Sequence, residues 1–247
     1  MKPIFCRFGA KTTLRKVIIP MIPDHKVYIE PFIGAGAIYF YKEPSEKEII
    51  NDIDTDLMKD YSLIKKSSSN LDKYEKNLNT LEKIKTFYNK KKITNEDKLT
   101  HSIIKRCHGF GGKVVVRSNV IYKTRNPFNK LQYIDKYKER MKNTKLYNTD
   151  YKNIIKKYDN KHAFFYLDPP YEDSKGLYKE HIINYEELNK ILTKLKGKFI
   201  LSINNSKYMR DLFRNFKQKE VIIKSGGVIS NKKGKKYIRK ELIIYNF

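Results

Sequence analysis

The feature that most constrains the fold is an unbroken apolar segment, Ala163-Phe164-Phe165-Tyr166-Leu167, which ends at Asp168-Pro169-Pro170-Tyr171. Apolar residues at every position, rather than at every second one, are typical of a strand buried on both faces. Two consecutive prolines cannot continue a hydrogen-bonded ladder, so the strand stops here in a rigid turn. Since a sheet buried on both faces needs covering helices, the segment predicts an α/β protein with a parallel sheet.

Strand and helix patterns alternate on both sides of this segment. On the N-terminal side, the pattern predicts strand 27–30, a glycine-containing turn at 31–36, a short helix 37–41 and strand 48–51. On the C-terminal side of Thr144, the predicted elements are strand 145–148, helix 152–158, strand 163–167, helix 184–195, strand 198–203, helix 206–215, strand 219–224 and strand 237–245. This alternation predicts a Rossmann-like, doubly wound core.

The pattern changes between about residues 67 and 141. A first helical spacing and a second helical stretch at about 95–105 are followed by two β-rich runs around a Ser-Asn turn, which predict a hairpin over 113–123. The apolar positions of the first helical spacing are Leu71, Tyr74, Leu78, Leu81 and Ile84. We therefore predict one core, residues 1–62 and 143–247, interrupted by a mainly helical insertion, residues 63–142, that bears the hairpin.

The chain is strongly basic, with 53 Lys and Arg against 27 Asp and Glu and a formal net charge of +26. Such an excess attracts polyanions and favours nucleic acid as a partner. Compositional bias is the alternative, because Lys, Asn, Ile and Tyr are the residues that an A·T-rich genome encodes. The charge therefore indicates nucleic-acid binding without proving it.

Several classes of protein are disfavoured. No apolar run approaches the roughly 18–20 residues of a membrane span, and the N-terminus lacks the apolar segment of a signal peptide. Cys6 and Cys107 match neither a zinc-site spacing nor a disulfide framework, so we expect two thiols in a reducing compartment. We therefore expect no membrane, no metal and a cytoplasmic location, or a nucleus or viral factory if the source is eukaryotic or viral.

The turn Asp168-Pro169-Pro170-Tyr171 is the sharpest candidate site. Open α/β sheets bind ligands at the carboxyl ends of their strands, where this turn lies. The Asp168 carboxylate and the Pro169 carbonyl offer two acceptors beside an aromatic ring, which suits the exocyclic amino group of a planar base. The alternative is an ordinary Asp-Pro loop with a packed tyrosine.

A second candidate site is the turn after the first strand, where Gly34 and Gly36 allow the backbone to approach a ligand closely. Its alternative is a tight strand–helix turn. Asp52 follows about 20 residues after the strand, where a carboxylate can accept bonds from ribose hydroxyls. An acidic residue there can also cap a helix, although Asp54 or Thr55 could serve as that cap.

Together these residues resemble a known family. Phe32-x-Gly34-x-Gly36 followed by Asp168-Pro169-Pro170-Tyr171, with an insertion between them, is similar to the Dam-type (D12 class, α-group) DNA adenine-N6 methyltransferases. Further similar segments are Arg7 to Lys11, Glu30 to Phe32, Asn51 to Asp54, Phe110 to Phe128, Asp150-Tyr151 and Ser202 to Asn205. The resemblance implies a site-specific adenine DNA methyltransferase that uses S-adenosylmethionine on double-stranded DNA.

The resemblance also implies residue roles. Asp168 would accept a hydrogen bond from the target amino group, with Pro169 and Pro170 holding the turn, and Tyr171 would stack on the flipped adenine. The cofactor would be bound by Arg7, Phe8, Lys11, Glu30, Phe32, Gly34, Gly36, Asp52, Asp150, Tyr151 and Asp168. DNA would be contacted by Lys113, Arg117, Asn119, Lys123 and Arg125, with further phosphate contacts from the basic loop 231–236.

Three other functions stay open at this point. The same chemistry could act on RNA adenine, or on the N4 of cytosine, because paired acceptors suit any exocyclic amine. A nucleic-acid-binding module with an inactive pocket is the third, and the intact Asp168 argues against it. The recognised site, a companion nuclease and any protein partner are not predicted.

Overall fold

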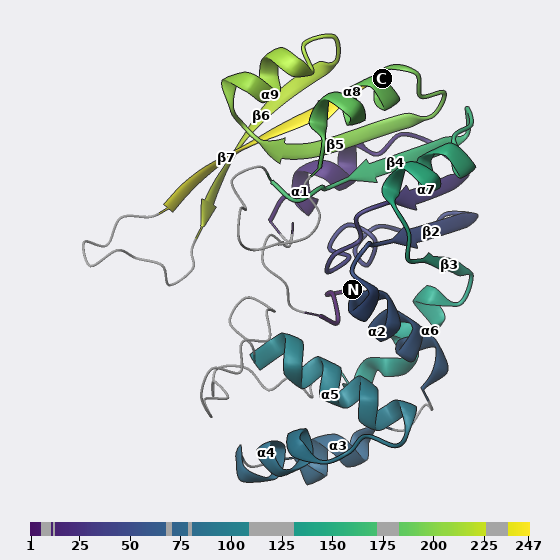
Figure 1. Cartoon of the computed structure of the whole chain (residues 1–247), viewed down its shortest axis with the longest axis vertical. Coiled ribbons are helices and arrows are strands. Elements are labelled where there is room, and N and C mark those ends of the chain that lie inside the picture. The colour runs from purple at the N-terminus through teal and green to yellow at the C-terminus, as the bar shows by residue number, and fades with distance from the viewer. Residues whose placement is uncertain are drawn as a thin grey trace. The chain divides into compact units, whose positions relative to one another are not determined.

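The computed structural model describes residues 1–5, 11, 13–67, 71–78, 81–108, 131–171, 183–225 and 237–247 (Figure 1). The predicted hairpin and the basic loop 231–236 lie outside the described residues. The chain divides into two compact units, each assembled from several segments. Unit 1 comprises Met1–Thr12, Ile33–Pro44 and Ile50–Thr149, and unit 2 comprises Thr13–Phe32, Ser45–Ile49 and Asp150–Phe247.

A seven-stranded sheet has the order β3-β2-β1-β4-β5-β7-β6. Its strands are β1 (Val27–Glu30), β2 (Lys47–Asn51), β3 (Thr144–Tyr147), β4 (Ala163–Leu167), β5 (Lys198–Asn204), β6 (Lys217–Ser225) and β7 (Tyr237–Tyr245). The step from β1 to β4 joins strands far apart in the sequence, as in doubly wound folds. The predicted Rossmann-like α/β class is confirmed.

Within unit 2, β4 lies between β1 and β5 and runs parallel to both (Figure 1). All five residues of β4 are buried, as the apolar run predicts. β7 is antiparallel to both of its neighbours, β5 and β6. The residues that follow β4 and β5 therefore leave the sheet at the same edge, which is where parallel sheets bind ligands.

Helices connect and cover the strands. They are α1 (Arg15–Ile18), the 3₁₀ segment η1 (Ile19–Met21), α2 (Thr55–Lys66), α3 (Asp72–Asn77), α4 (Leu81–Asn89), α5 (Asn95–His108), α6 (Ile134–Met141), α7 (Tyr151–Tyr158), α8 (Tyr185–Thr193) and α9 (Lys207–Leu212). Among the described residues, no helix combines the length and the apolar character needed to cross a bilayer.

The predicted helix 37–41 is wrong. The segment forms successive turns with isolated helical bonds, from Phe40 N to Gly36 O (3.0 Å) and from Lys42 N to Ile38 O (3.0 Å). Its side chains from Ala37 to Phe40 are all buried, so the apolar character reflects burial on every side rather than one helical face.

Two other helix predictions are corrected at their ends. The helical spacing from Leu71 to Ile84 belongs to two helices, because α3 ends at Asn77 and α4 begins at Leu81. The helix predicted over 206–215 is α9, which stops at Leu212 because Phe213 leaves the helical region at φ −101°, ψ 21°.

An aromatic cluster forms part of the core of unit 1. The Phe40 ring lies 4.9 Å from Tyr39, 5.5 Å from Tyr137 and 6.3 Å from Tyr61, measured between ring centroids. Phe5 packs edge-on against Tyr61 at 5.2 Å. Edge-to-face aromatic contacts of this kind add to the stabilisation from area burial. Phe40 and Tyr61 of this cluster lie against Gly36.

Candidate active site

The Asp168 carboxylate lies directly after β4 and is half-buried. Its Oδ1 accepts a hydrogen bond from Ser202 Oγ of β5 at 3.3 Å. The same Oγ lies 3.0 Å from the Tyr166 hydroxyl. A serine has one hydroxyl proton, so when Ser202 donates to Asp168, Tyr166 must donate to Ser202.

The hydrogen bonds from Tyr166 to Ser202 and from Ser202 to Asp168 orient the carboxylate. Tyr166 and Ser202 are buried, and burial, followed by the charge of Asp168, raises the pKa of the Tyr166 hydroxyl well above its usual range. Tyr166 therefore stays protonated and remains a donor at physiological pH. One carboxylate oxygen is thus fixed by the sheet, while the side chain stays partly accessible.

The other residues of the turn are tied to two more elements of unit 2. The Pro170 carbonyl accepts a hydrogen bond from the hydroxyl of Tyr185, the first residue of α8, at 2.8 Å. The Tyr171 hydroxyl donates to Glu241 of β7, whose side chain is fully buried. Hydrogen bonds to β5, α8 and β7 therefore hold the turn in place in addition to its two prolines.

In unit 1, both glycines of the turn have positive φ values. Gly34 and Gly36 have φ values of +48° and +70°, a backbone conformation that glycine adopts with little cost. The Tyr61 hydroxyl of α2 donates to the Gly34 carbonyl at 2.8 Å. A Cβ at Gly34 would meet nothing within 4 Å, so one side of the turn is open.

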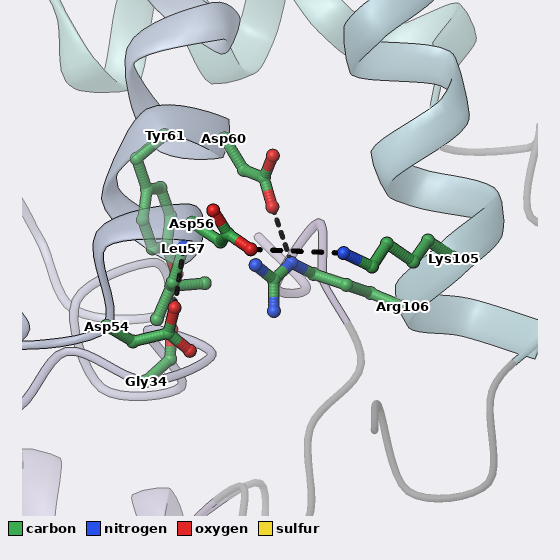
Figure 2. A network of polar contacts seen from close by, with 8 residues as sticks. All are labelled: Gly34, Asp54, Asp56, Leu57, Asp60, Tyr61, Lys105 and Arg106. Atoms are coloured by element: carbon green, nitrogen blue, oxygen red, sulfur yellow. Dashed lines mark hydrogen bonds and ion pairs between the residues drawn. The ribbon is translucent and has the colours of Figure 1, made fainter. Parts of the chain in front are cut away.

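Asp52 binds this turn rather than capping a helix. Its Oδ2 accepts from Gly34 N at 2.9 Å, and its Oδ1 accepts from Asp54 N at 3.0 Å. Asp54 is the N-cap of α2 and accepts from Leu57 N at 2.9 Å, as Figure 2 shows. The helix-cap alternative for Asp52 is therefore wrong, and Asp52 is placed on the glycine turn that the ribose hypothesis requires.

Side chains from β2 and the segment after β3 fix the position of Asp52. Asn51 Nδ2 donates to the Thr149 carbonyl, and Thr149 N donates to Asn51 Oδ1, both at 3.0 Å. Asn148 Nδ2 donates to the Asp52 carbonyl at 2.8 Å. This amide network holds the start of α2 and the glycine turn in a defined geometry.

A third group of predicted residues lies in unit 2. The Phe32 and Tyr151 rings are 5.1 Å apart at an angle of 36°. Asp150 is the N-cap of α7 and accepts from Lys152 N at 2.8 Å. Tyr151 is buried, and its hydroxyl has no hydrogen-bond partner among the described residues.

The environment of Tyr151 keeps its hydroxyl neutral. Burial, together with the charges of Glu187 and Asp150, raises the pKa of Tyr151 to about 12. A buried neutral hydroxyl without a partner is costly unless a ligand or water satisfies it. The Phe32–Tyr151 ring pair with this hydroxyl therefore suits an aromatic ligand that carries polar groups.

Glu30 and Lys11, two further predicted cofactor residues, are both buried. Glu30 is the buried last residue of β1, and Lys11 is buried in unit 1. The other predicted cofactor residues, Arg7 and Phe8, and the predicted DNA-contacting residues, Lys113, Arg117, Asn119, Lys123 and Arg125, lie outside the described residues. Within the described residues, no group of three or more His, Cys, Asp or Glu side chains is arranged to hold a metal ion.

Comparison with known proteins identifies the family. The model of the D12 class N6 adenine-specific DNA methyltransferases matches residues 8–225. The chain belongs to this family. The match covers both glycine-turn and Asp168 segments, so the predicted resemblance is confirmed.

Named relatives of this D12-class chain are methyltransferases as well. The Type II methyltransferase M.MjaIII of Methanocaldococcus jannaschii is 30% identical over all of this chain and 99% of its own length. The Type II methyltransferase M.CviBI of Paramecium bursaria Chlorella virus NC1A is 26% identical over 87% and 88% of the two chains. The DNA N-6-adenine-methyltransferase of Escherichia phage P1 is 22% identical over 87% of this chain and 31% of its own length.

The D12-class chain is therefore an adenine-specific DNA methyltransferase whose methyl donor is S-adenosylmethionine. The residues present fit such a cofactor. In unit 1, the open side of Gly34 and the Asp52 carboxylate on the same turn suit the amino-acid and ribose parts of S-adenosylmethionine. In unit 2, the buried hydroxyl of Tyr151 beside Phe32 suits a polar aromatic ring such as adenine.

Several side chains that hold the site of this methyltransferase were not predicted as site residues, among them Tyr61, Tyr185 and Glu241. Tyr61 and Tyr185 carry no signal, because tyrosines on helices are common in this chain. Glu241 does carry one, since it is an acidic residue immediately before the apolar run Leu242-Ile243-Ile244 and it faces inward. Buried acidic residues in strands usually have a partner with a specific role.

Proposed function

We propose that this enzyme transfers a methyl group to N6 of an adenine rotated out of duplex DNA, and that Asp168 and the Pro169 carbonyl bind the reacting amino group. The observation that carries the proposal is the half-buried Asp168 carboxylate, fixed by Ser202 at the carboxyl end of β4. When bound, S-adenosylmethionine supplies a methyl group activated by its sulfonium.

Asp168 and Pro169 act on the nitrogen lone pair. An adenine amino group is a poor nucleophile because its lone pair is delocalised into the ring. Two fixed acceptors on its two hydrogens favour a pyramidal nitrogen with a localised lone pair. The same acceptors stabilise the positive charge that grows on nitrogen, and they require no reorganisation because Ser202 already orients Asp168.

Tyr171 provides the platform for the base. Its hydroxyl is held by Glu241, so the ring has a fixed orientation before a base arrives. Stacking on such a preoriented ring recovers part of the few kcal/mol that unstacking a base costs. The role of Glu241 is to position Tyr171, because its carboxylate is fully buried.

The residues proposed for cofactor binding have separate roles. Asp52 binds the ribose hydroxyls, Gly34 and Gly36 allow the approach of the cofactor backbone, and Asp150 and Tyr151 bind the adenine ring beside Phe32. Lys11 and Glu30 contribute to the same cofactor site, together with Arg7 and Phe8 from the N-terminal segment.

Duplex DNA is bound by the basic residues of the predicted hairpin. Lys113, Arg117, Asn119, Lys123 and Arg125 lie in or beside a segment whose two β-rich runs predict a hairpin, and a two-stranded ribbon fits the major groove. The net charge of +26 supplies the sequence-independent part of the affinity. The relatives named Type II methyltransferases support a role as the modification partner of a restriction nuclease.

Labelled S-adenosylmethionine with a random-sequence duplex tests the proposal. After incubation, the duplex is digested to nucleosides and the methylated position is identified, with single- and double-stranded RNA of matched composition as controls. We expect the label in N6-methyldeoxyadenosine, at adenines that share one sequence context. Label in N4-methylcytosine, or label in RNA at an equal rate, would contradict the proposal.

A further inference from the structure

A cleft of about 410 Å³ lies between α2 and α5 in unit 1, and its lining includes none of the residues assigned to catalysis and cofactor binding. The two helices are joined by the buried ion pair between Arg106 Nε and Asp60 Oδ2, at 2.6 Å. Figure 2 shows Asp56 and Asp60 of α2 facing Lys105 and Arg106 of α5. This ion pair links the two walls of the cleft.

The two walls present basic stripes at helical spacing. On α2, Lys59 and Lys66 are seven residues apart and line the cleft. On α5, Lys98, His101 and Lys105 follow at intervals of three and four residues, which places them on one face. Periodicity therefore directs each of these side chains into the same space.

Positive charge in the cleft exceeds the negative charge available to it. The lining includes five lysines and two aspartates. Asp60 is engaged by Arg106, and Asp56 lies 4.0 Å from Lys105. The lining carboxylates are thus matched, while Lys59, Lys66 and Lys98 are exposed and have no carboxylate within ion-pair distance among the described residues.

Lys92 and His101 line the cleft, and both side chains are held in place by contacts with α4. The Lys92 ammonium donates to the Phe87 carbonyl and to the Tyr88 carbonyl at 3.3 Å, which anchors it at the C-terminus of α4. The His101 ring stacks on Tyr88 at 4.4 Å. Burial, followed by the charges of Lys92 and Lys105, lowers the pKa of His101. Lys92 and Lys105 therefore disfavour a charge on His101, and an anion bound beside the ring would favour it.

We propose that this cleft binds a backbone phosphate of duplex DNA. The proposal rests on the proposed function only for the identity of the substrate. The α5 wall is continuous in sequence with the predicted recognition hairpin, since α5 ends at His108 and the hairpin segment begins at 113. Clustered lysines are the side chains that neutralise phosphates in nucleic-acid complexes.

The first test measures DNA affinity across a range of salt concentrations, without turnover. The variant K59Q/K66Q/K98Q removes three cleft charges, and the control K73Q/K76Q/K145Q removes three exposed charges of unit 1 outside the cleft. Loss of one phosphate contact lowers the salt slope by about 0.9. We expect the cleft variant to lose at least about fivefold in affinity and about one unit of slope relative to the control, with K59R/K66R/K98R close to wild type. Equal affinities and slopes for the cleft and control variants would overturn the proposal.

The second test follows the His101 ring by NMR, which distinguishes the source of the phosphate. We expect duplex DNA to raise the pKa of His101 in the wild type and not in K59Q/K66Q/K98Q. A rise with inorganic phosphate or AMP but not with duplex would overturn the proposal in favour of a free phosphorylated ligand. Neither test requires methyl transfer. An enzyme without activity would therefore refute the proposed function, while DNA affinity and the His101 titration would still test phosphate binding by the cleft.

Discussion

Replacing Gly36 by alanine tests whether the glycine turn is shaped by the aromatic core beneath it. A Cβ at Gly36 would lie 2.9 Å from Phe40 Cδ2, 3.0 Å from Phe40 Cε2 and 3.2 Å from the Tyr61 hydroxyl. Phe40 is buried among three other aromatic rings and cannot move freely. The φ of +70° costs an alanine about 1–2 kcal/mol, and overpacking adds about 1–3 kcal/mol. We therefore expect Gly36→Ala to destabilise the protein by about 2–5 kcal/mol.

Gly34→Ala is the matched control, because Gly34 has a φ of +48° and no atom within 4 Å of the added Cβ. Only the conformational cost of about 1–2 kcal/mol applies there. Unfolding in urea, followed by circular dichroism and by the fluorescence of the 19 tyrosines in a chain without tryptophan, gives the two shifts. Equal shifts for both variants would refute the argument that the Phe40 ring limits the turn.

Three further predictions concern charge, capping and cofactor binding. Asp54→Ala removes the N-cap of α2 and should cost about 1 kcal/mol in thermal unfolding, while S-adenosylmethionine still binds; an unchanged melting temperature would argue against the cap. Asp52→Ala should weaken S-adenosylmethionine binding, measured by calorimetry, more than DNA binding, and equal losses would count against the ribose assignment. Charge reversal of the basic loop at Lys232, Lys233, Lys235 and Lys236 should flatten the salt dependence of DNA affinity, and an unchanged slope would remove that loop from the interface.

Much of unit 2 could be predicted because its signals are local. The strand Ala163–Leu167 is apolar at every position, and the prolines that follow fix its end. The helix α7 begins at Tyr151 because Asp150 caps it, and Asn184 and Ser206 cap α8 and α9 in the same way. Each of these signals lies within a few residues of the structure that it specifies.

The errors occurred where tertiary packing outweighs local pattern. The segment from Ala37 to Phe40 looks like a short apolar helix, but the packing of Tyr39 and Phe40 into the unit 1 core holds it in turns. Helix α6 was missed, although Ile134, Tyr137 and Met141 form a buried face, because the surrounding segment is dominated by charged residues.

The candidate site also combines residues with a local sequence signal and residues whose position depends on tertiary packing. Asp168 and Asp52 could be selected as candidates because each follows a recognisable strand. The partners that hold the Asp168 turn are distant in sequence: Ser202 lies 34 residues from Asp168, and Glu241 lies 70 residues from Tyr171. Their proximity depends on the strand order and on the register of β5 with β7, which no local pattern specifies.

The most direct measurement of the central claim is the single-turnover rate of methyl transfer by Asp168→Ala at saturating DNA and S-adenosylmethionine. If the fixed carboxylate binds the reacting amino group, the rate should fall by at least about 10²-fold, as when one preorganised group is removed from an enzyme site. The affinities for DNA and cofactor should stay within a few fold, which separates a loss of chemistry from a loss of folding. A rate close to that of the wild type would contradict the account.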